Sequence, residues 1–255
     1  CGSKAEPSAD SSVDQNTAAP TESDIKTYKV AIIKQLDHAS LDEIANARWR
    51  GQKVFVETCP QYLVLDDSVY YNEDWLQAAK YVCSPPIRKK ADCNALWRAI
   101  RRGEVQTVST DHCSFTLAQK DAGREDFTKI PGGLPGVETR GELIYSYGVA
   151  AKKLSLAQMC RVLSENPAKL YGLYPRKGVL APGSDADIVI YDPGDSHVIR
   201  AEDCVANVDY NPYEGFVTAG GIREVWLRGR KTVENGKVLD TVPAGMYLAR
   251  GKCDL

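Results

Sequence analysis

The sequence predicts an α/β protein with a small all-β region at its C-terminus. Apolar, β-branched segments alternate with helical segments of about ten residues over most of the chain, which is typical of βα units around a parallel sheet. From Gly178 onward the pattern changes to short β segments separated by glycine turns. With 255 residues, of which 43% are hydrophobic, the chain can bury one large core or two modest ones.

The first 24 residues differ in composition from the rest of the chain. They contain five acidic residues, one lysine and no aromatic residue, and 14 of the 24 are Ala, Gly, Ser, Thr or Pro. Such a segment has too little apolar surface to offset the entropy lost on ordering, so we predict a disordered tail over residues 1–25. Cys1, followed by Gly2 and Ser3, is also similar to the mature end of a bacterial lipoprotein. A lipidated tail and a plain flexible tail are both open at this point.

Residues 26–175 are expected to form the α/β region. Strands are expected at residues 28–36, 54–58, 81–84 and 105–110, and helices at residues 40–50, 93–102, 143–153 and 155–163. Ser40 and Glu43 form a capping box that would open the first helix, and Gly51 would end it. Gly103 follows the second helix in the same way.

Residues 176–255 are expected to form the small β region and a tail. The expected strands lie at residues 186–191, 216–218, 224–227 and 231–234. Glycines between these segments predict turns, so the region should be a small arrangement of short strands.

Charge and cysteine content exclude several classes of protein. Lys and Arg number 32 against 34 Asp and Glu, a net charge of −2, so there is no basic excess of the kind that nucleic-acid binding requires. No stretch approaches the roughly 18 to 20 apolar residues of a membrane span. The eight cysteines form no CxxC pair, which argues against a zinc ribbon, and scattered reduced thiols fit the cytoplasm. With three histidines, any site of several imidazoles must use nearly all of them.

Seven segments, in order along the chain, carry a resemblance to a known family. They lie at residues 57–62, 83–88, 109–113, 130–140, 165–169, 177–187 and 211–215. From about residue 47 to residue 255 the sequence resembles the C-terminal part of the hydantoinase and dihydropyrimidinase branch of the amidohydrolases. The resemblance implies the C-terminal strands and helices of a partial (β/α)₈ barrel, followed by a small β-sandwich portion.

The resemblance gives Asp111 a catalytic and a metal-binding role. Asp111 lies in the segment Ser109-Thr-Asp-His-Cys113, directly after the expected strand 105–110, and barrel enzymes place their chemistry at the C-terminal ends of strands. In the family the matching aspartate binds metal and carries a proton to the leaving amide nitrogen, which is sound chemistry for a fixed carboxylate. The alternative is that Asp111 only caps the following turn.

Two further residues are expected to contact a substrate. Ser84 matches a family position whose backbone holds the cyclic amide, and Gly132 stands where hydantoinases often have asparagine. A tight turn beside the neighbouring prolines is an equally good explanation of both. His112 is expected to be a packed or loop histidine, and His197 to be exposed. Arg88 and Glu138 could pair, and neither is given a role.

The metal ligands of the complete family are mostly not found in this sequence. The resemblance implies a binuclear centre of divalent metal, zinc by expectation, with an HxH pair, a carboxylated lysine and two further histidines, and no HxH occurs here. In the family, the last of these histidines lies about 18 residues before the position that matches Gln52. That count leads to Lys34 and not to His38, and a protonated lysine is a poor metal ligand. Asp111 is therefore the only family ligand that can be placed.

The main hypothesis is a metal-dependent hydrolase of hydantoin or dihydropyrimidine rings, incomplete and weakly active or inactive as this chain. Residues 1–45 also resemble the start of a solute-binding lipoprotein of an ABC importer, with a junction inside residues 42–50. The alternative is thus a lipid-anchored solute-binding or non-enzymatic module with a vestigial hydrolase part, and a fusion, a truncation or a split enzyme all stay open.

The expected partners follow from the main hypothesis. They are a small cyclic amide and, because an open parallel sheet exposes an edge, further copies of the chain. No nucleic acid is expected, and a membrane only if Cys1 is lipidated. The expected location is the cytoplasm, or a membrane-anchored lipoprotein if the lipidation of Cys1 holds.

Overall fold

The computed structural model describes residues 38–240, 243 and 245–255, so the expected tail and the expected strand at residues 28–36 lie outside it. The helices are α1 (His38–Trp49), α2 (Pro60–Val64), α3 (Trp75–Ala79), α4 (Lys90–Arg102), α5 (Leu117–Asp121), α6 (Arg140–Ile144), α7 (Leu156–Cys160) and α8 (Asn166–Leu170). The strands are β1 (Glu57–Thr58), β2 (Thr107–Val108), β3 (Ile188–Asp192), β4 (Gly221–Leu227), β5 (Arg230–Glu234) and β6 (Lys237–Val238). Short 3₁₀ turns lie at Asp67–Tyr70, Phe127–Lys129 and Ala201–Asp203.

Two parallel strands, β1 and β2, lie in the middle of the described structure. They pair over two residues each, Glu57 with Thr107 and Thr58 with Val108, and are shorter than the sequence predicted. The side chain of Gln106 explains part of the difference, because its Oε1 accepts from Val56 N (2.9 Å) where a strand partner would otherwise bond. The observed architecture is α/β, as predicted, and a partial barrel remains an expectation.

Helix α4 covers one side of this pair of strands. Its apolar residues recur at helical spacing, and Cys93, Leu96, Trp97 and Ile100 are all buried. Trp97 donates from its indole nitrogen to the carbonyl of Leu63 at 3.0 Å, which joins α4 to α2. Gly103 ends the helix with a φ of 77°, a left-handed conformation that glycine adopts without strain. The predictions for α4 and for its end are confirmed.

Three predicted helices differ in detail from the observed ones. α1 begins at His38, so Ser40 lies in its first turn and is not the cap that the sequence predicted. α6 continues as a π-helix over Tyr145–Ala150, and α7 continues as a π-helix over Arg161–Glu165 directly into α8. The helix predicted at residues 155–163 therefore continues for seven more residues, to Leu170.

Two predicted strands are wrong. Residues 81–84 form a turn and a loop, and the carbonyl of Val82 accepts from Gly133 N (3.1 Å) and from Lys120 Nζ (2.7 Å), so its bonds run to a loop and a side chain. Residues 216–218 make one isolated bridge, between Val198 and Val217. Residues 216–218 bond to residues 197–199, through Thr218 N to the carbonyl of His197 and Ile199 N to the carbonyl of Phe216 (both 2.8 Å), but this pairing is too short to form a strand. Propensity alone does not make a ladder.

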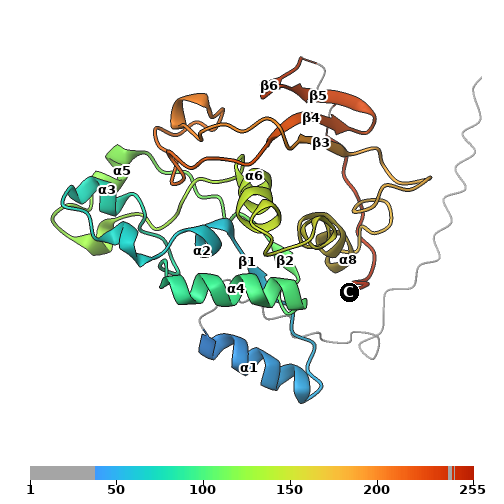
Figure 1. The fold of residues 1–255 in the computed structure, drawn as a ribbon, viewed down its shortest axis with the longest axis horizontal. Helices are drawn as coiled ribbons and strands as arrows, with labels where there is room; N and C mark the ends of the chain where they lie inside the picture. Colours follow the sequence, from blue (N-terminus) through green and yellow to red (C-terminus); the bar gives the residue numbers. More distant parts are fainter. Residues whose placement is uncertain (1–37, 241–242, 244) are drawn as a thin grey trace, which may run out of the picture.

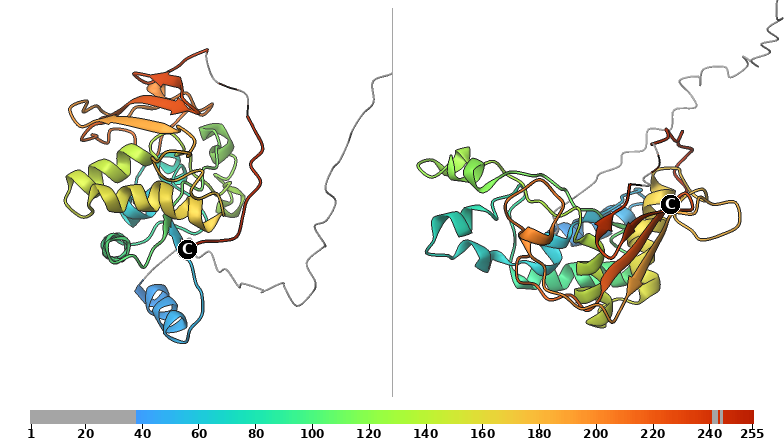
Figure 2. Two further views of the ribbon diagram at one scale, coloured as in Figure 1. Left: turned by 90° about the vertical axis from the view of Figure 1, so that its right-hand side faces the viewer. Right: turned by 90° about the horizontal axis from the view of Figure 1, so that it is seen from above.

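The C-terminal sheet has the order β3-β4-β5-β6, with every neighbouring pair antiparallel. It packs on α6 and its π-helical continuation: Ile222 N donates to the carboxylate of Glu142 (3.2 Å), and the rings of Tyr145 and Tyr191 lie 4.3 Å apart. The sheet lies at one end of the molecule and α1 at the other, with β1 and β2 between them (Figures 1 and 2). The sandwich assignment remains an expectation.

Candidate functional site

The backbone turns sharply at Asp111, three residues after the end of β2. Asp111 is half-buried and has a φ of 49°, in the left-handed region that non-glycine residues adopt infrequently. The side-chain amide of Gln61 donates to the carbonyl of Thr110 at 3.4 Å, so α2 holds the residue before the turn. Residues in such conformations cluster at functional sites. Asp111 thus lies beyond the carboxyl end of a parallel strand, where the sequence predicted it.

Polar side chains from β1, β2 and α6 surround the two strands. Glu57 accepts a hydrogen bond from the hydroxyl of Thr107 at 2.9 Å, and the thiol of Cys59 lies 3.3 Å from the hydroxyl of Ser109. Arg140, at the start of α6, donates to the carbonyl of Val108 at 3.3 Å. Burial lowers the pKa of Arg140, although Glu57 and Cys59 oppose the shift, and the guanidinium stays charged.

Hydrogen bonds to His112 link the loop of residues 130–137 to the segment that carries Asp111. Its Nδ1 accepts from the backbone N–H groups of Gly136 (3.1 Å) and Val137 (3.3 Å). Cys113 N donates to the carbonyl of Leu134 at 2.9 Å, next to the bridge between His112 and Leu134. Because Nδ1 is an acceptor, the neutral ring carries its proton on Nε2. His112 is therefore a loop residue, as predicted.

Ser84 and Gly132 are 48 positions apart in the sequence and lie side by side in the structure. A Cβ atom built on Gly132 would be 3.6 Å from Ser84 N and 3.8 Å from Ser84 Cβ. The next residue, Gly133, donates its N–H to the carbonyl of Val82 at 3.1 Å. The structure therefore brings the two predicted substrate-binding residues together, while their contact with a substrate stays a prediction.

At Gly133 the loop of residues 130–137 packs tightly against Cys113, in the segment that carries Asp111. Its φ is 155°, and a Cβ atom there would lie 2.6 Å from Cys113 Cβ and 2.8 Å from Cys113 Sγ. No side chain fits at that distance, so the close packing of the two segments requires glycine.

Lys120, which the sequence analysis did not single out, holds both loops. Its side chain is completely buried, and its Nζ donates to the carbonyls of Val82 (2.7 Å), Pro131 (2.7 Å) and Gly133 (2.9 Å). Burial lowers the pKa of Lys120 to about 8. The sequence around it is polar and gives no sign that this lysine is buried, so only the structure reveals its role.

Buried tyrosines pack beneath the loops. Tyr62 donates its hydroxyl to the carbonyl of Pro85 at 3.0 Å, and burial raises its pKa well above the ordinary value, so it remains a donor. Tyr213, from the segment 211–215, is 1% exposed, and its hydroxyl lies 3.7 Å from the position of a Cβ on Gly136. Asn211 Oδ1 accepts from Tyr213 N at 2.9 Å and fixes the turn. This motif of the C-terminal region therefore supports the loops around Asp111.

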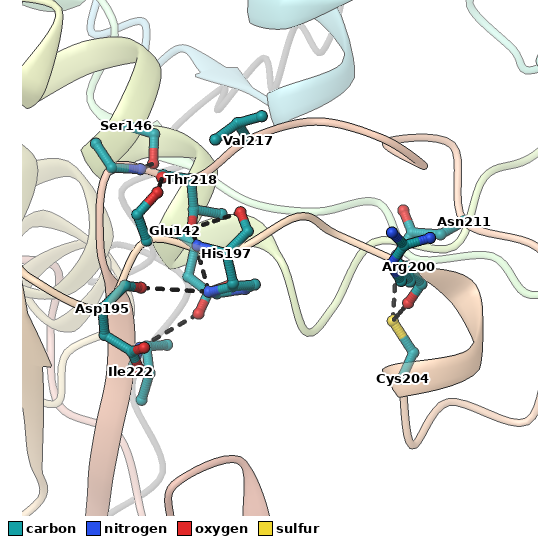
Figure 3. A network of polar contacts seen from close by, with 12 residues as sticks. Glu142, Ser146, Asp195, His197, Arg200, Cys204, Asn211, Val217, Thr218 and Ile222 are labelled. Carbon is teal, nitrogen blue, oxygen red and sulfur yellow. Dashed lines mark hydrogen bonds and ion pairs between the residues drawn. The ribbon is translucent and has the colours of Figure 1, made fainter.

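A second polar cluster joins α6 to the C-terminal region (Figure 3). His197 is exposed, as predicted, and its Nε2 lies 3.5 Å from the carboxylate of Glu142, while its Nδ1 lies 3.2 Å from the hydroxyl of Thr218. Ser146 accepts from Ala219 N at 2.8 Å. The contacts of Glu142 and Ser146 cross between α6 or its continuation and residues after 190, so the cluster is a structural junction.

Glu138 has a structural role that the sequence did not assign. Its carboxylate accepts from the backbone N–H groups of Val205 (3.1 Å) and Ala206. It therefore anchors the loop before the segment 211–215, which carries Tyr213.

Asp111 does not belong to a metal-binding cluster among the described residues. Within residues 38–240, 243 and 245–255, no three His, Cys, Asp or Glu side chains are grouped so that they could hold a metal ion. The side chain of His38 lies outside the described part. The described donors therefore do not fit a complete metal centre, although Asp111 alone has the carboxylate chemistry of a ligand.

A cavity of about 590 Å³ lies elsewhere, between α3 and residues 200–214. It is lined by Gln77, Lys80, Leu117, Arg200, Ala201, Glu202, Val208, Asp209, Tyr210, Asn211 and Glu214. Ser84, Asp111 and Gly132 do not line it, so its volume carries no argument about their chemistry.

No helix in the described part of the chain is both long and apolar enough to cross a membrane.

The chain is similar to known proteins over most of its length. A sequence model described as "Amidohydrolase family" matches residues 25–237. The D-hydantoinase of Geobacillus stearothermophilus is 44% identical over 214 residues, which are 84% of this chain and 45% of the relative. The D-phenylhydantoinase of Escherichia coli O1:K1 is 42% identical over 82% of this chain and 45% of its own length. The chain thus spans about half the length of the curated relatives it matches.

Solved structures agree with these matches. The crystal structure of dihydropyrimidinase from Brevibacillus agri superposes with a TM-score of 0.77 at 45% identity, over 79% of this chain and 44% of that one. The L-hydantoinase of Arthrobacter aurescens gives a TM-score of 0.75 at 30% identity, over 82% and 46% of the two chains. The family match begins at residue 25, inside the segment compared above with ABC importers, and the importer resemblance gains no support.

Proposed function

The chain belongs to the amidohydrolase family, and we propose that it contributes Asp111 and two substrate-binding loops to a hydrolase that opens cyclic amide rings. The proposed substrate class is hydantoins and dihydropyrimidines, because the relatives that match at 42–45% identity are named for these rings. The proposed architecture is the C-terminal part of a (β/α)₈ barrel, with the sheet β3–β6 as a portion of a β-sandwich.

One observation carries the proposal: Asp111 follows a parallel strand in a left-handed conformation, beside two loops that hold Ser84 against Gly132. Hydrolysis of an amide needs a base that takes a proton from water and delivers it to the leaving nitrogen. Asp111 is the carboxylate at this position. The backbone groups of Ser84 and Gly132 would hold the flat ring of the substrate, since peptide N–H and C=O groups match those of a cyclic amide.

A divalent metal, zinc by preference, is part of the proposal for the assembled enzyme. Such an ion makes hydroxide available near neutral pH. The described residues offer Asp111 as one ligand and no complete set, so we derive no step through the metal. The other ligands would come from the part of the curated relatives that this chain does not cover, and residues 1–255 alone should be weakly active or inactive.

Complementation tests the proposal. The chain is mixed with the part of the Geobacillus stearothermophilus D-hydantoinase that it does not cover, in zinc or manganese, and ring opening of dihydrouracil or hydantoin is followed in the ultraviolet. Turnover that requires both polypeptides supports the proposal. The relative's own segment, matching this chain, is the control. If that control restores turnover and this chain does not, the proposed function is wrong.

We further propose a cytoplasmic setting and self-association. Seven described cysteines are free thiols, and thiols persist in reducing compartments. Association is proposed because the strand pair β1–β2 is short and the chain spans about half of its relatives. Light scattering of the purified chain checks this, and a monomer at high concentration would contradict it.

A further inference from the structure

Lys120 stands out among the described charged residues because it is completely buried and its ammonium group donates to three backbone carbonyls. The thiols of Cys83 and Cys113 lie near it, and its Nζ lies 5.6 Å from the centre of the Phe115 ring. Burying an ammonium group is unfavourable unless hydrogen bonds replace its hydration. Three carbonyls at 2.7–2.9 Å supply that replacement, one for each N–H group.

The three acceptors come from two different loops. Val82 lies two residues before Ser84, and Pro131 and Gly133 lie on either side of Gly132. The amide and carbonyl of Gly132 itself are not among the partners of the ammonium group. The lysine thus fixes the backbone around both predicted substrate-binding residues without contacting either of them through these bonds.

We propose that Lys120 is a positioning residue for substrate binding: its ammonium group ties the loop of Ser84 to the loop of Gly132 and sets the distance between the two backbone segments that hold the ring. The proposal rests on the proposed function above. Besides Lys120, one backbone hydrogen bond joins the loops, from Gly133 N to the carbonyl of Val82. If the ammonium group is removed, that backbone bond remains, but the three carbonyls lose their charged donor.

Geometry makes the site specific for lysine. A primary ammonium directs three N–H groups along separate directions, whereas a guanidinium is a planar fork and is bulkier. Methionine has a similar length and fills the space without donating a hydrogen bond. Lys120→Met therefore removes the donors, and Lys120→Arg keeps the charge but not the arrangement.

Two measurements on the full chain test the proposal. Amide hydrogen exchange reports the opening of residues 82–85 and 130–137, and titration with a 5-substituted hydantoin and with dihydrouracil reports affinity. For Lys120→Met we expect exchange at Gly133 to rise roughly ten- to hundredfold, because bonds from a charged donor are lost. Affinity should fall by at least about tenfold, with exchange in α4 unchanged. Lys120→Arg should show the same pattern.

Lys153→Met is the matched control. Lys153 is half-buried, and its Nζ lies 5.0 Å from the centre of the Trp97 ring, on helix α4. This variant should leave both the loop exchange and the affinity unchanged. Should Lys120→Met fail to fold, Lys120→Arg carries the same test.

The outcomes separate the two proposals. Unchanged exchange in the two loops of a folded Lys120 variant overturns the positioning role. So does a rise that is uniform over the whole chain, because that is a loss of global stability. If the unaltered chain and its complemented form bind no cyclic amide while the Lys120 variant loosens the loops selectively, the proposed function fails and the substrate role falls with it, although the tie between the loops stands.

Discussion

The loops around Asp111 and the sheet β3–β6 are held together in different ways. In the sheet, strands that follow one another along the chain from β4 to β6 pair through backbone ladders, with a register shift between Val225 and Trp226. In the loop cluster, residues 82–85, 109–113, 130–137 and 211–215 come from distant parts of the sequence. Single side chains hold them: Lys120 bonds three carbonyls, His112 two N–H groups, and Tyr62 one carbonyl.

This difference has a consequence for how each region responds to substitution. A ladder distributes its stability over many equivalent bonds, so one exposed side chain contributes little. A loop cluster depends on a few buried groups, each of which serves several backbone partners, and the loss of one leaves polar groups buried without a donor. Substitutions at the loops should therefore have larger effects than matched substitutions in the sheet.

The largest expected effect is that of Asp111→Asn on ring opening by the complemented enzyme. Asparagine tolerates the left-handed backbone at this position but cannot accept and return a proton. We expect a loss of about 10²–10⁴ in rate with little change in stability, measured by the ultraviolet assay and by urea unfolding. His38→Ala is the control and should retain activity, since the family's ligand position falls on Lys34. Loss in the control with an active Asp111→Asn would show that the site is misplaced.

Paired glycine substitutions compare the two regions directly. Gly133→Ala would place Cβ 2.6 Å from Cys113 Cβ, whereas Gly236→Ala, in the turn between β5 and β6 with a φ of 75°, would meet nothing within 4 Å. We expect Gly133→Ala to lower the free energy of unfolding by about 2–4 kcal/mol, because strain and overlap add. Gly236→Ala should lower it by about 1 kcal/mol, from strain alone. Urea titrations of both variants check this, and equal losses would contradict the comparison.

The buried lysine predicts a pH dependence of stability. Burial lowers the pKa of Lys120 to about 8, from an ordinary value of 10.5. Between these values the unfolded chain binds more protons than the folded chain, so this group makes the free energy of unfolding rise with pH, by about 3 kcal/mol in all.

The measurement compares the unaltered chain with Lys120→Met in urea at pH 7 and pH 10. Groups common to both proteins cancel in the difference. Burial raises the pKa of the facing thiol of Cys83 to about 11, so it stays largely neutral over this range. The advantage of the unaltered chain should grow with pH, and a constant or shrinking difference would be the contrary result.

The smallest expected effect is at a lysine of the sheet. Lys231 pairs with the carboxylates of Glu224 at 3.1 Å and Glu234 at 2.7 Å, and its side chain is half-buried, in contrast to the complete burial of Lys120. Ion pairs that water still reaches contribute little. Lys231→Met should leave the urea midpoint within experimental error, and a loss as large as that of Lys120→Met would remove the contrast between the two regions.

Much of the fold could be predicted where local patterns decide the structure. The amphipathic spacing of α4 and the glycine after it gave the helix within three residues at its start and at the observed residue at its end. The strands β3, β4 and β5 were predicted from their β-branched residues. Glycines also marked the turns that end β4 and β5, Gly229 and Gly236. The short β6 was missed, because two residues carry no periodic signal.

The candidate site could be predicted only in part. Asp111 was predicted because it follows a strand and lies in a motif, and Ser84 and Gly132 were predicted by resemblance; the roles of all three stay predictions. Lys120, Arg140 and Tyr213 were not, since their role depends on which loops meet them. Residues 81–84 were predicted as a strand for the same reason: β-branched residues indicate an extended backbone but not whether a partner strand lies beside it.

The sequence by itself determined the α/β class, the amphipathic helix α4, the strands β3, β4 and β5 and the position of Asp111 after β2, because each depends on neighbours within a few residues along the chain. Only the tertiary structure decided that Ser84 meets Gly132, that the buried Lys120 bonds to both of their loops and that His112 bonds to the loop of residues 130–137. These contacts join residues far apart in the sequence. They exist because buried carbonyl and N–H groups must each find a partner, and the sequence alone does not say which partner lies within reach.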